Sequence, residues 1–131
     1  MNNKETKFVK ALIKGTEKGE ITWNEVNRSD YTEIVNDEEE HIDTAFYHTD
    51  LGRNIIILKS KVYLKNDKDE NIEKSNVHIV FTKNFEFKEE FRISDFELEN
   101  KSILWTLLKL VQRRERKTED FMNTFINRYL K

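Results

Sequence analysis

The stretch N-I-I-I-L-K-S-K-V-Y-L-K, residues 54–65, decides the fold of this chain. Ile56 and Leu58 share one side of it. Ile55 and Ile57 share the other side, so the apolar residues recur at a period of two. This period is typical of a β-strand. We therefore predict a strand that is buried on both faces in its first half and on one face in its second half.

Shorter runs with a similar pattern lie on both sides of this strand. They predict strands near residues 42–49, 77–82 and 85–93, and a short fifth strand at 31–35. The connections are short and polar, and one of them contains Gly52. Parallel strands would need crossovers of about a dozen residues or more. The sequence thus predicts an antiparallel meander of about five strands.

Helical spacing marks the two ends of the chain. Phe8, Val9, Leu12 and Ile13 form one stripe, which predicts an N-terminal helix that ends near Gly19. Ile21 and Trp23 follow on alternate positions, and we expect this short extended segment to anchor the chain to the core. Together with the helices below, these patterns predict a single α+β domain over residues 1–131.

Two further helices are predicted after residue 100. The first has apolar residues at helical spacing from Ile103 to Val111, and the second from Phe121 to Leu130. A connection of about five charged residues predicts that the two helices pack antiparallel, on the sheet or beside the N-terminal helix. We expect Phe125 to belong to the core. The alternative is that this last stripe is an interface between copies of the chain.

The composition excludes several classes of protein. The chain has no cysteine, which rules out disulfides, thiol catalysis, Fe–S clusters and thiolate zinc sites. The longest strictly aliphatic run is Ile55 to Leu58, so neither a signal peptide nor a membrane span is expected. A reducing cytoplasm is the expected location.

Motifs for catalysis or cofactor binding are missing from the sequence. The three glycines, Gly15, Gly19 and Gly52, are too few and too far apart for a phosphate-binding loop. No serine has the flanking glycines of a nucleophile elbow. We therefore expect no enzyme activity, no catalytic residue and no cofactor.

The residues that could hold a metal are dispersed. His41 and His48 are expected to diverge along one strand, and His78 lies on another. The loop at residues 67–71 copies the first alternating ligands of a calcium loop, but Ile72 stands where that loop needs glycine. A polar hairpin loop accounts for it better, so no metal site is expected.

Charge is distributed unevenly although the formal net charge is only −2. Residues 17–50 carry eleven acids against two bases, and residues 101–117 carry six bases against one acid. Such segregation indicates electrostatic complementarity with a partner, or neutralisation within the fold. The sharpest acidic run is formed by Asp37, Glu38, Glu39 and Glu40, and the sharpest basic run by Arg113, Arg114, Arg116 and Lys117.

Three functions follow from these patterns, in order of preference. The first is a non-enzymatic protein–protein interaction module, such as an inhibitor, an immunity-type protein or a regulator, whose acidic run at 37–40 docks a protein partner. The second is a nucleic-acid-binding protein that uses the basic run at 113–117, where each cation would neutralise a phosphate. The third is a small-ligand binder with its site in the curved sheet. A homo-oligomer is compatible with the first.

Overall fold

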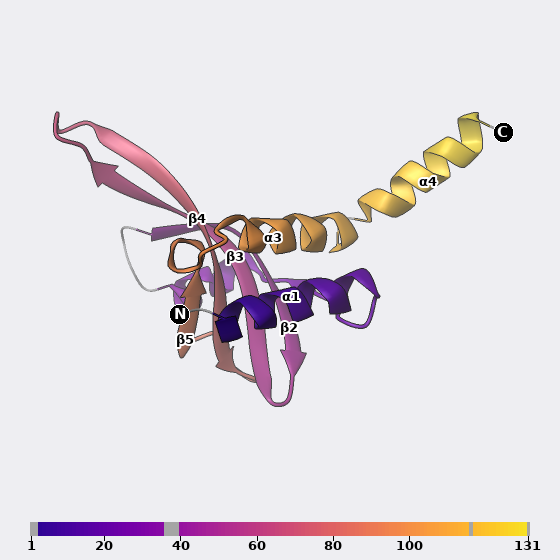
Figure 1. Cartoon of the computed structure of the whole chain (residues 1–131), viewed down its shortest axis with the longest axis horizontal. Helices are drawn as coiled ribbons and strands as arrows, with labels where there is room; N and C mark the ends of the chain where they lie inside the picture. The colour runs from indigo at the N-terminus through magenta and orange to yellow at the C-terminus, as the bar shows by residue number, and fades with distance from the viewer. Residues whose placement is uncertain (1–2, 36–39, 116, 131) are drawn as a thin grey trace.

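The computed structural model describes residues 3–35, 40–115 and 117–130. It confirms the predicted α+β arrangement of an N-terminal helix, a five-stranded antiparallel sheet and two C-terminal helices (Figure 1). The elements in chain order are α1 (Asn3–Glu17), β1 (Asn24–Glu25), η1 (Arg28–Asp30), α2 (Tyr31–Ile34), β2 (Glu40–Asp50), β3 (Arg53–Lys65), β4 (Asn71–Lys83), β5 (Phe91–Ser94), η2 (Asp95–Glu97), α3 (Ser102–Glu115) and α4 (Thr118–Tyr129).

The sheet is a meander in which each strand pairs with its neighbours in the sequence, in the order β1-β2-β3-β4-β5. The central pair, β3 and β4, is the longest. The 54–65 stretch predicts β3, whereas β4 begins at Asn71, well before the predicted strand at 77–82. Pairing with β2 reaches Val62 of β3, and pairing with β5 begins at His78 of β4. The β3–β4 ribbon therefore projects beyond the rest of the sheet (Figure 1).

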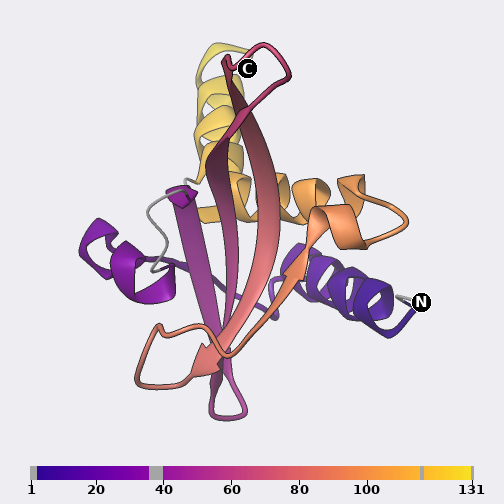
Figure 2. The same ribbon diagram turned by 90° about the vertical axis from the view of Figure 1, so that its left-hand side faces the viewer.

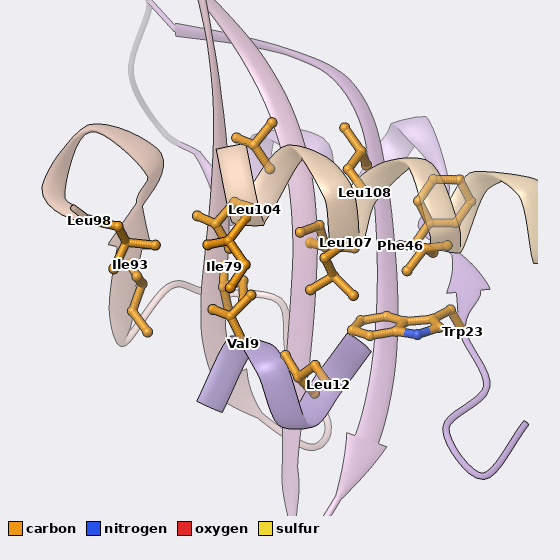
Figure 3. Close-up of a cluster of buried hydrophobic side chains, with 14 residues drawn as sticks. Val9, Leu12, Trp23, Phe46, Ile79, Ile93, Leu98, Leu104, Leu107 and Leu108 are labelled. Atoms are coloured by element: carbon orange, nitrogen blue, oxygen red, sulfur yellow. The ribbon is translucent and has the colours of Figure 1, made fainter. Parts of the chain in front are cut away.

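One face of the sheet, the helix-covered face, carries the larger core. Helices α1 and α3 lie side by side on it, and their apolar stripes meet Phe46, Ile57 and Ile79 (Figure 3). The α1 stripe contributes Val9 and Leu12. Burial of each such side chain stabilises the fold by about 1.5–3 kcal/mol. The fully or nearly buried residues of α3 are Ile103, Leu104, Leu107, Leu108 and Val111.

Side-chain and backbone hydrogen bonds join the ends of α1 and α3. The indole Nε1 of Trp23 donates to Thr16 Oγ1 at 3.0 Å, and its backbone N–H donates to Glu115 Oε1 at 3.2 Å. Arg114 donates to the backbone carbonyl of Glu17. Trp23 is buried and anchors the chain as predicted. The left-handed conformation of Gly19, with φ of 76°, ends α1 as expected.

The other face of the sheet, the opposite face, has a smaller apolar cluster under η1 and α2 (Figure 2). Ile34 of α2 packs there on Ala45, Leu58 and Val80. The sequence prediction for this segment was wrong, because residues 31–35 form a helical turn rather than a strand. Tyr31 and Ile34 are three residues apart, so one turn of helix brings both side chains onto the cluster. The fifth strand is instead β1.

The predicted strand at 85–93 is also shorter than expected, since only Phe91–Ser94 joins the sheet. Phe85 is 99% exposed, whereas Phe87 packs against Tyr47 on the opposite face. The polar loop after β3 agrees with its prediction. The side chain of Asn66 accepts the backbone N–H groups of Lys68 and Glu70 there.

A β-bulge in β2 changes which face its residues occupy. Ile42 pairs with Ser60, but Thr44 pairs with Lys59, so Asp43 is an extra residue. Ile42 consequently packs on the opposite face and Phe46 on the helix-covered face. Simple alternation along a regular strand would place Ile42, Thr44 and Phe46 on one side. The bulge likewise turns Glu40 toward the opposite face.

Helix α4 differs from its prediction in position. It forms where the sequence indicates, but it points away from the sheet and from α1 rather than folding back along α3 (Figure 1). Phe125 is 53% exposed, so the expectation that it belongs to the core is wrong. Lys117 precedes α4 with a left-handed φ of 54° and sets the direction in which the chain leaves α3.

Candidate functional site

The predicted acidic docking run divides into two parts. Asp37, Glu38 and Glu39 lie outside the residues that the structure describes. Glu40 begins β2, and its side chain is only 10% exposed. It therefore belongs to the packed interior of the opposite face rather than to the exposed surface.

Glu40 is the centre of a buried charge network. Its Oε2 accepts a hydrogen bond from Ser60 Oγ at 2.6 Å and one from Arg92 Nη1 at 3.0 Å. His78 Nε2 lies 3.4 Å from the same oxygen. The other imidazole nitrogen, Nδ1, is 2.7 Å from Ser94 Oγ. We call these five residues, Glu40, Ser60, His78, Arg92 and Ser94, the Glu40 network.

These neighbours lower the pKa of Glu40 from its ordinary value of 4.5 to about 2. The imidazole of His78 has the largest effect, and burial opposes it by raising the pKa. Hydrogen bonds from Ser60 and Arg92 add to the lowering. A carboxyl group with this pKa is ionised across the neutral range, so it holds no proton for general acid catalysis.

The order Ser94–His78–Glu40 resembles the nucleophile, base and carboxylate of a serine hydrolase. The resemblance does not extend to the accessibility of the serine. Ser94 is 1% exposed, whereas a nucleophile must reach its substrate. The Glu40 carboxylate also serves Arg92 and Ser60 as well as the imidazole. The network is thus built to hold β2, β3, β4 and β5 together.

Arg92 links the network to the surface. Its Nη2 is 2.7 Å from Glu89 Oε1, while its Nη1 reaches inward to Glu40. A pocket of about 490 Å³ opens beside this pair, and Lys88 and Glu33 also line it. Three acids and two bases line the pocket, so neither an anion nor a cation would meet charges of a single sign there.

The basic run is partly gathered at the end of α3. Arg113, Arg114 and Lys117 line a pocket of about 410 Å³ where α3 meets α4, and Asp120 lines it too. Arg114 already holds the C-terminal end of α1 through the Glu17 carbonyl. Arg116 lies outside the described residues. The structure therefore brings three of the four predicted cations together, and Arg114 is engaged within the fold.

The three histidines occupy separate places. His41 lies edge-on to Tyr63, His48 Nδ1 is 2.8 Å from the Thr22 carbonyl, and His78 belongs to the Glu40 network. Within residues 3–35, 40–115 and 117–130, no three His, Asp or Glu side chains gather as ligands for one metal ion.

The largest unpartnered feature is the apolar face of α4. Its six side chains are between 37% and 80% exposed: Phe121, Met122, Phe125, Ile126, Tyr129 and Leu130, which we call the α4 stripe. The rings of Phe121, Phe125 and Tyr129 stack in sequence along the helix, with centroids 6.2 and 4.7 Å apart. The sequence identified this stripe, but its exposure could not be inferred from helical spacing.

A second exposed apolar group lies at the tip of the β3–β4 ribbon, where Tyr63, Leu64 and Ile72 are each about half exposed. The β3–β4 ribbon and α4 both project from the body of the molecule, and they point in different directions (Figure 1). The ribbon tip is the smaller of the two exposed apolar groups, and lysines flank it at positions 61, 65 and 74. Such flanking charges are typical of protected strand edges.

The helices of the described residues are all too short or too polar to cross a membrane. Comparison of the chain with protein-family models, curated proteins and solved structures gave no match.

Proposed function

We propose that this chain is a non-enzymatic protein–protein interaction module and that the α4 stripe is its docking surface. The observation that carries the proposal is the exposure of six large apolar side chains on one helix outside the core. Contiguous exposed apolar patches of this kind mark interaction sites on protein surfaces. The sequence pointed to the acidic run at 37–40 as the docking surface, whereas here the docking surface is α4.

The low stability of an isolated helix supports the proposal that a partner covers α4. A helix of 12 residues is marginally stable in water by itself, and most helices are stabilised by packing of an apolar face. The main contact of α4 with the described part of the body is with α3. A partner that covers the α4 stripe would supply the packing that the monomer leaves out.

The burial of the Glu40 network supports the non-enzymatic part of the proposal, since its one serine–histidine pair is sealed inside the sheet. We place the module in the cytoplasm, because a cysteine-free chain gains nothing from an oxidising compartment.

Site-specific photo-crosslinking in the cells that produce the protein tests the proposal. A benzophenone amino acid at Phe125 should give covalent adducts with protein on irradiation, because this ring would lie inside the interface. The control position is Asn127, which is on the polar side of the same helix. Adducts from Phe125 that are absent from Asn127 are expected. If neither Phe125 nor Phe121 yields a protein adduct, α4 is not a docking surface.

Nucleic-acid binding remains the second candidate because Arg113, Arg114 and Lys117 surround one pocket. Asp120 in that pocket and the bond from Arg114 to Glu17 weigh against it. We expect no electrophoretic shift of random DNA or RNA at low salt.

The matched variant for this test is Arg113→Ala with Lys117→Ala, which leaves Arg114 in place to hold α1. Should a shift occur, these substitutions ought to flatten the log–log salt dependence by up to about two units if both cations contact phosphates. A micromolar shift that the paired substitutions abolish would favour the nucleic-acid function over ours.

A further inference from the structure

We infer that the partner of the α4 stripe is the α4 stripe of a second copy, and that the two helices pack antiparallel across a twofold axis between Phe125 and Ile126. This inference rests on the proposed function and specifies its partner. Three observations carry it: the internal symmetry of the stripe, its division into ridges and its area.

The stripe maps onto itself when the helix is reversed. Its apolar residues occur as three adjacent pairs, at 121–122, 125–126 and 129–130. The middle pair is the centre of this pattern. An antiparallel copy would place the first pair against the third and the middle pair against itself. A twofold interface needs such a self-complementary patch, whereas a patch for an unrelated partner has no reason to be symmetric.

The spacing of the pairs also defines the packing. Phe121, Phe125 and Tyr129 form one row with a step of four residues, and their rings already stack along it. Met122, Ile126 and Leu130 form a parallel row. Two helices whose i±4n rows interdigitate cross at about −50°, which differs from the shallow angle of a coiled coil. Each aromatic row would then fill the groove between the two rows of the other copy.

The area of the stripe is sufficient for a stable dimer. Its side chains expose on the order of 700 Å² per chain, taking about 200 Å² for each fully exposed aromatic side chain and somewhat less for an aliphatic one. Complete coverage of the stripe in two copies would thus bury up to roughly 1,400 Å², which lies within the standard range of about 1,200–2,000 Å² for specific interfaces.

The position of α4 makes the contact accessible. Lys117 turns the chain away from α3, so that the stripe stands clear of the sheet and of α1 (Figure 1).

Measurement of the mass in solution is the first test. Sedimentation of the full chain at tens of micromolar should give twice the chain mass of 15.9 kDa. Phe125→Asp should give the monomer mass, with the dissociation constant raised about 100-fold or more because the change removes a central aromatic side chain from both copies. Asn127→Asp, on the polar side of the same helix, should leave the dimer intact.

Melting of the Phe125→Asp monomer separates an interface from a core position. We expect its circular dichroism to retain the sheet signal and its unfolding to stay cooperative, because the α4 stripe is outside the core. If the variant unfolds, α4 belongs to the body and both the inference and the proposed function are wrong. If the wild-type chain stays at the monomer mass up to about 100 μM, or if Phe125→Asp remains a dimer, the inference fails. Crosslinking at Phe125 then still decides the proposed function separately.

Single cysteines test the orientation, and the chain offers a background free of native cysteine. Ile126→Cys lies beside the proposed twofold axis and should form a disulfide between copies under mild oxidation. Phe121→Cys should not pair with its own copy, since antiparallel packing puts the two residues at opposite ends. A disulfide needs Cα atoms about 4.4–6.8 Å apart. Efficient self-pairing of Phe121→Cys would indicate parallel helices and overturn the arrangement.

Discussion

Replacing Glu40 with alanine is expected to lower the free energy of unfolding by about 3 kcal/mol at neutral pH. The change leaves Arg92 without its inward partner and leaves the Ser60 hydroxyl unpaired within the opposite face. Removal of one partner from a buried ion pair typically costs about 3–5 kcal/mol, and the partial exposure of Arg92 places this case at the lower end. Chemical denaturation of the full chain at pH 7 measures the effect.

Glu89→Ala is the matched control, because Glu89 binds the outer end of the same arginine. Its side chain is 34% exposed, and exposed ion pairs contribute about 0–1 kcal/mol. An equal loss of stability from both substitutions would mean that the bond from Arg92 to Glu40 contributes no more than the bond from Arg92 to Glu89. Nearly unchanged stability of Glu40→Ala would contradict the role of the network in holding the strands together.

The contribution of Glu40 should also depend on pH. Its folded-state pKa of about 2 lies below its ordinary value of 4.5, so the ionised form stabilises the fold above pH 4.5. This stabilisation, about 2–3 kcal/mol after screening by solvent near Arg92, is lost as the pH falls toward 2. Unfolding curves of wild type and Glu40→Gln should therefore differ at pH 7 and converge toward pH 2. A constant difference would contradict the pKa assignment.

Leu107→Ala is expected to cost about 2–5 kcal/mol, a large share of the stability of a small domain. Leu107 is fully buried where α3 crosses the sheet, so the deletion would leave a cavity in the larger core (Figure 3). The matched control on the same helix is Lys109→Ala, whose side chain is exposed. Surface changes of this kind usually stay within about 0.5 kcal/mol.

The same measurement on α4 distinguishes the two C-terminal helices. At dilutions where the chain is monomeric, Ile126→Ala should change the unfolding free energy by less than about 0.5 kcal/mol, because this residue is about half exposed and belongs to neither buried cluster. A loss comparable to that of Leu107→Ala would place α4 in the body of the monomer.

The architecture could be predicted from the sequence where a periodic pattern is long. The 54–65 strand and the α3 stripe each offer many positions that agree with one period, and both elements formed. The second half of the strand is exposed from Tyr63 onward rather than buried on one face, because it lies in the projecting ribbon. The structure of short segments could be predicted less well. The three apolar or aromatic positions at 31–35 fit a strand or a helical turn, and the contact of Tyr31 and Ile34 with the opposite face decided between them.

The burial of Glu40 and the exposure of α4 depend on features that the periodic spacing of apolar residues does not represent. Glu40 lies beside three other acids in the sequence and therefore resembles a surface loop residue. The extra residue Asp43 turns it toward His78 and Arg92, which come from distant strands. For α4, helical spacing indicates that the apolar face packs against another surface. The sequence does not say whether that surface belongs to the same chain or to another copy.

The connection between the two ends of the chain has a consequence for the order of folding. The three long strands β2, β3 and β4 each pair with the next through a short loop, and such local pairing closes quickly. The contact of Trp23 with Glu115, by contrast, spans 92 residues. During synthesis α1 emerges first, yet Val9 and Leu12 find their cover only after α3 has left the ribosome. We therefore expect the nascent chain to hold a formed sheet with an undocked first helix until its last third is complete.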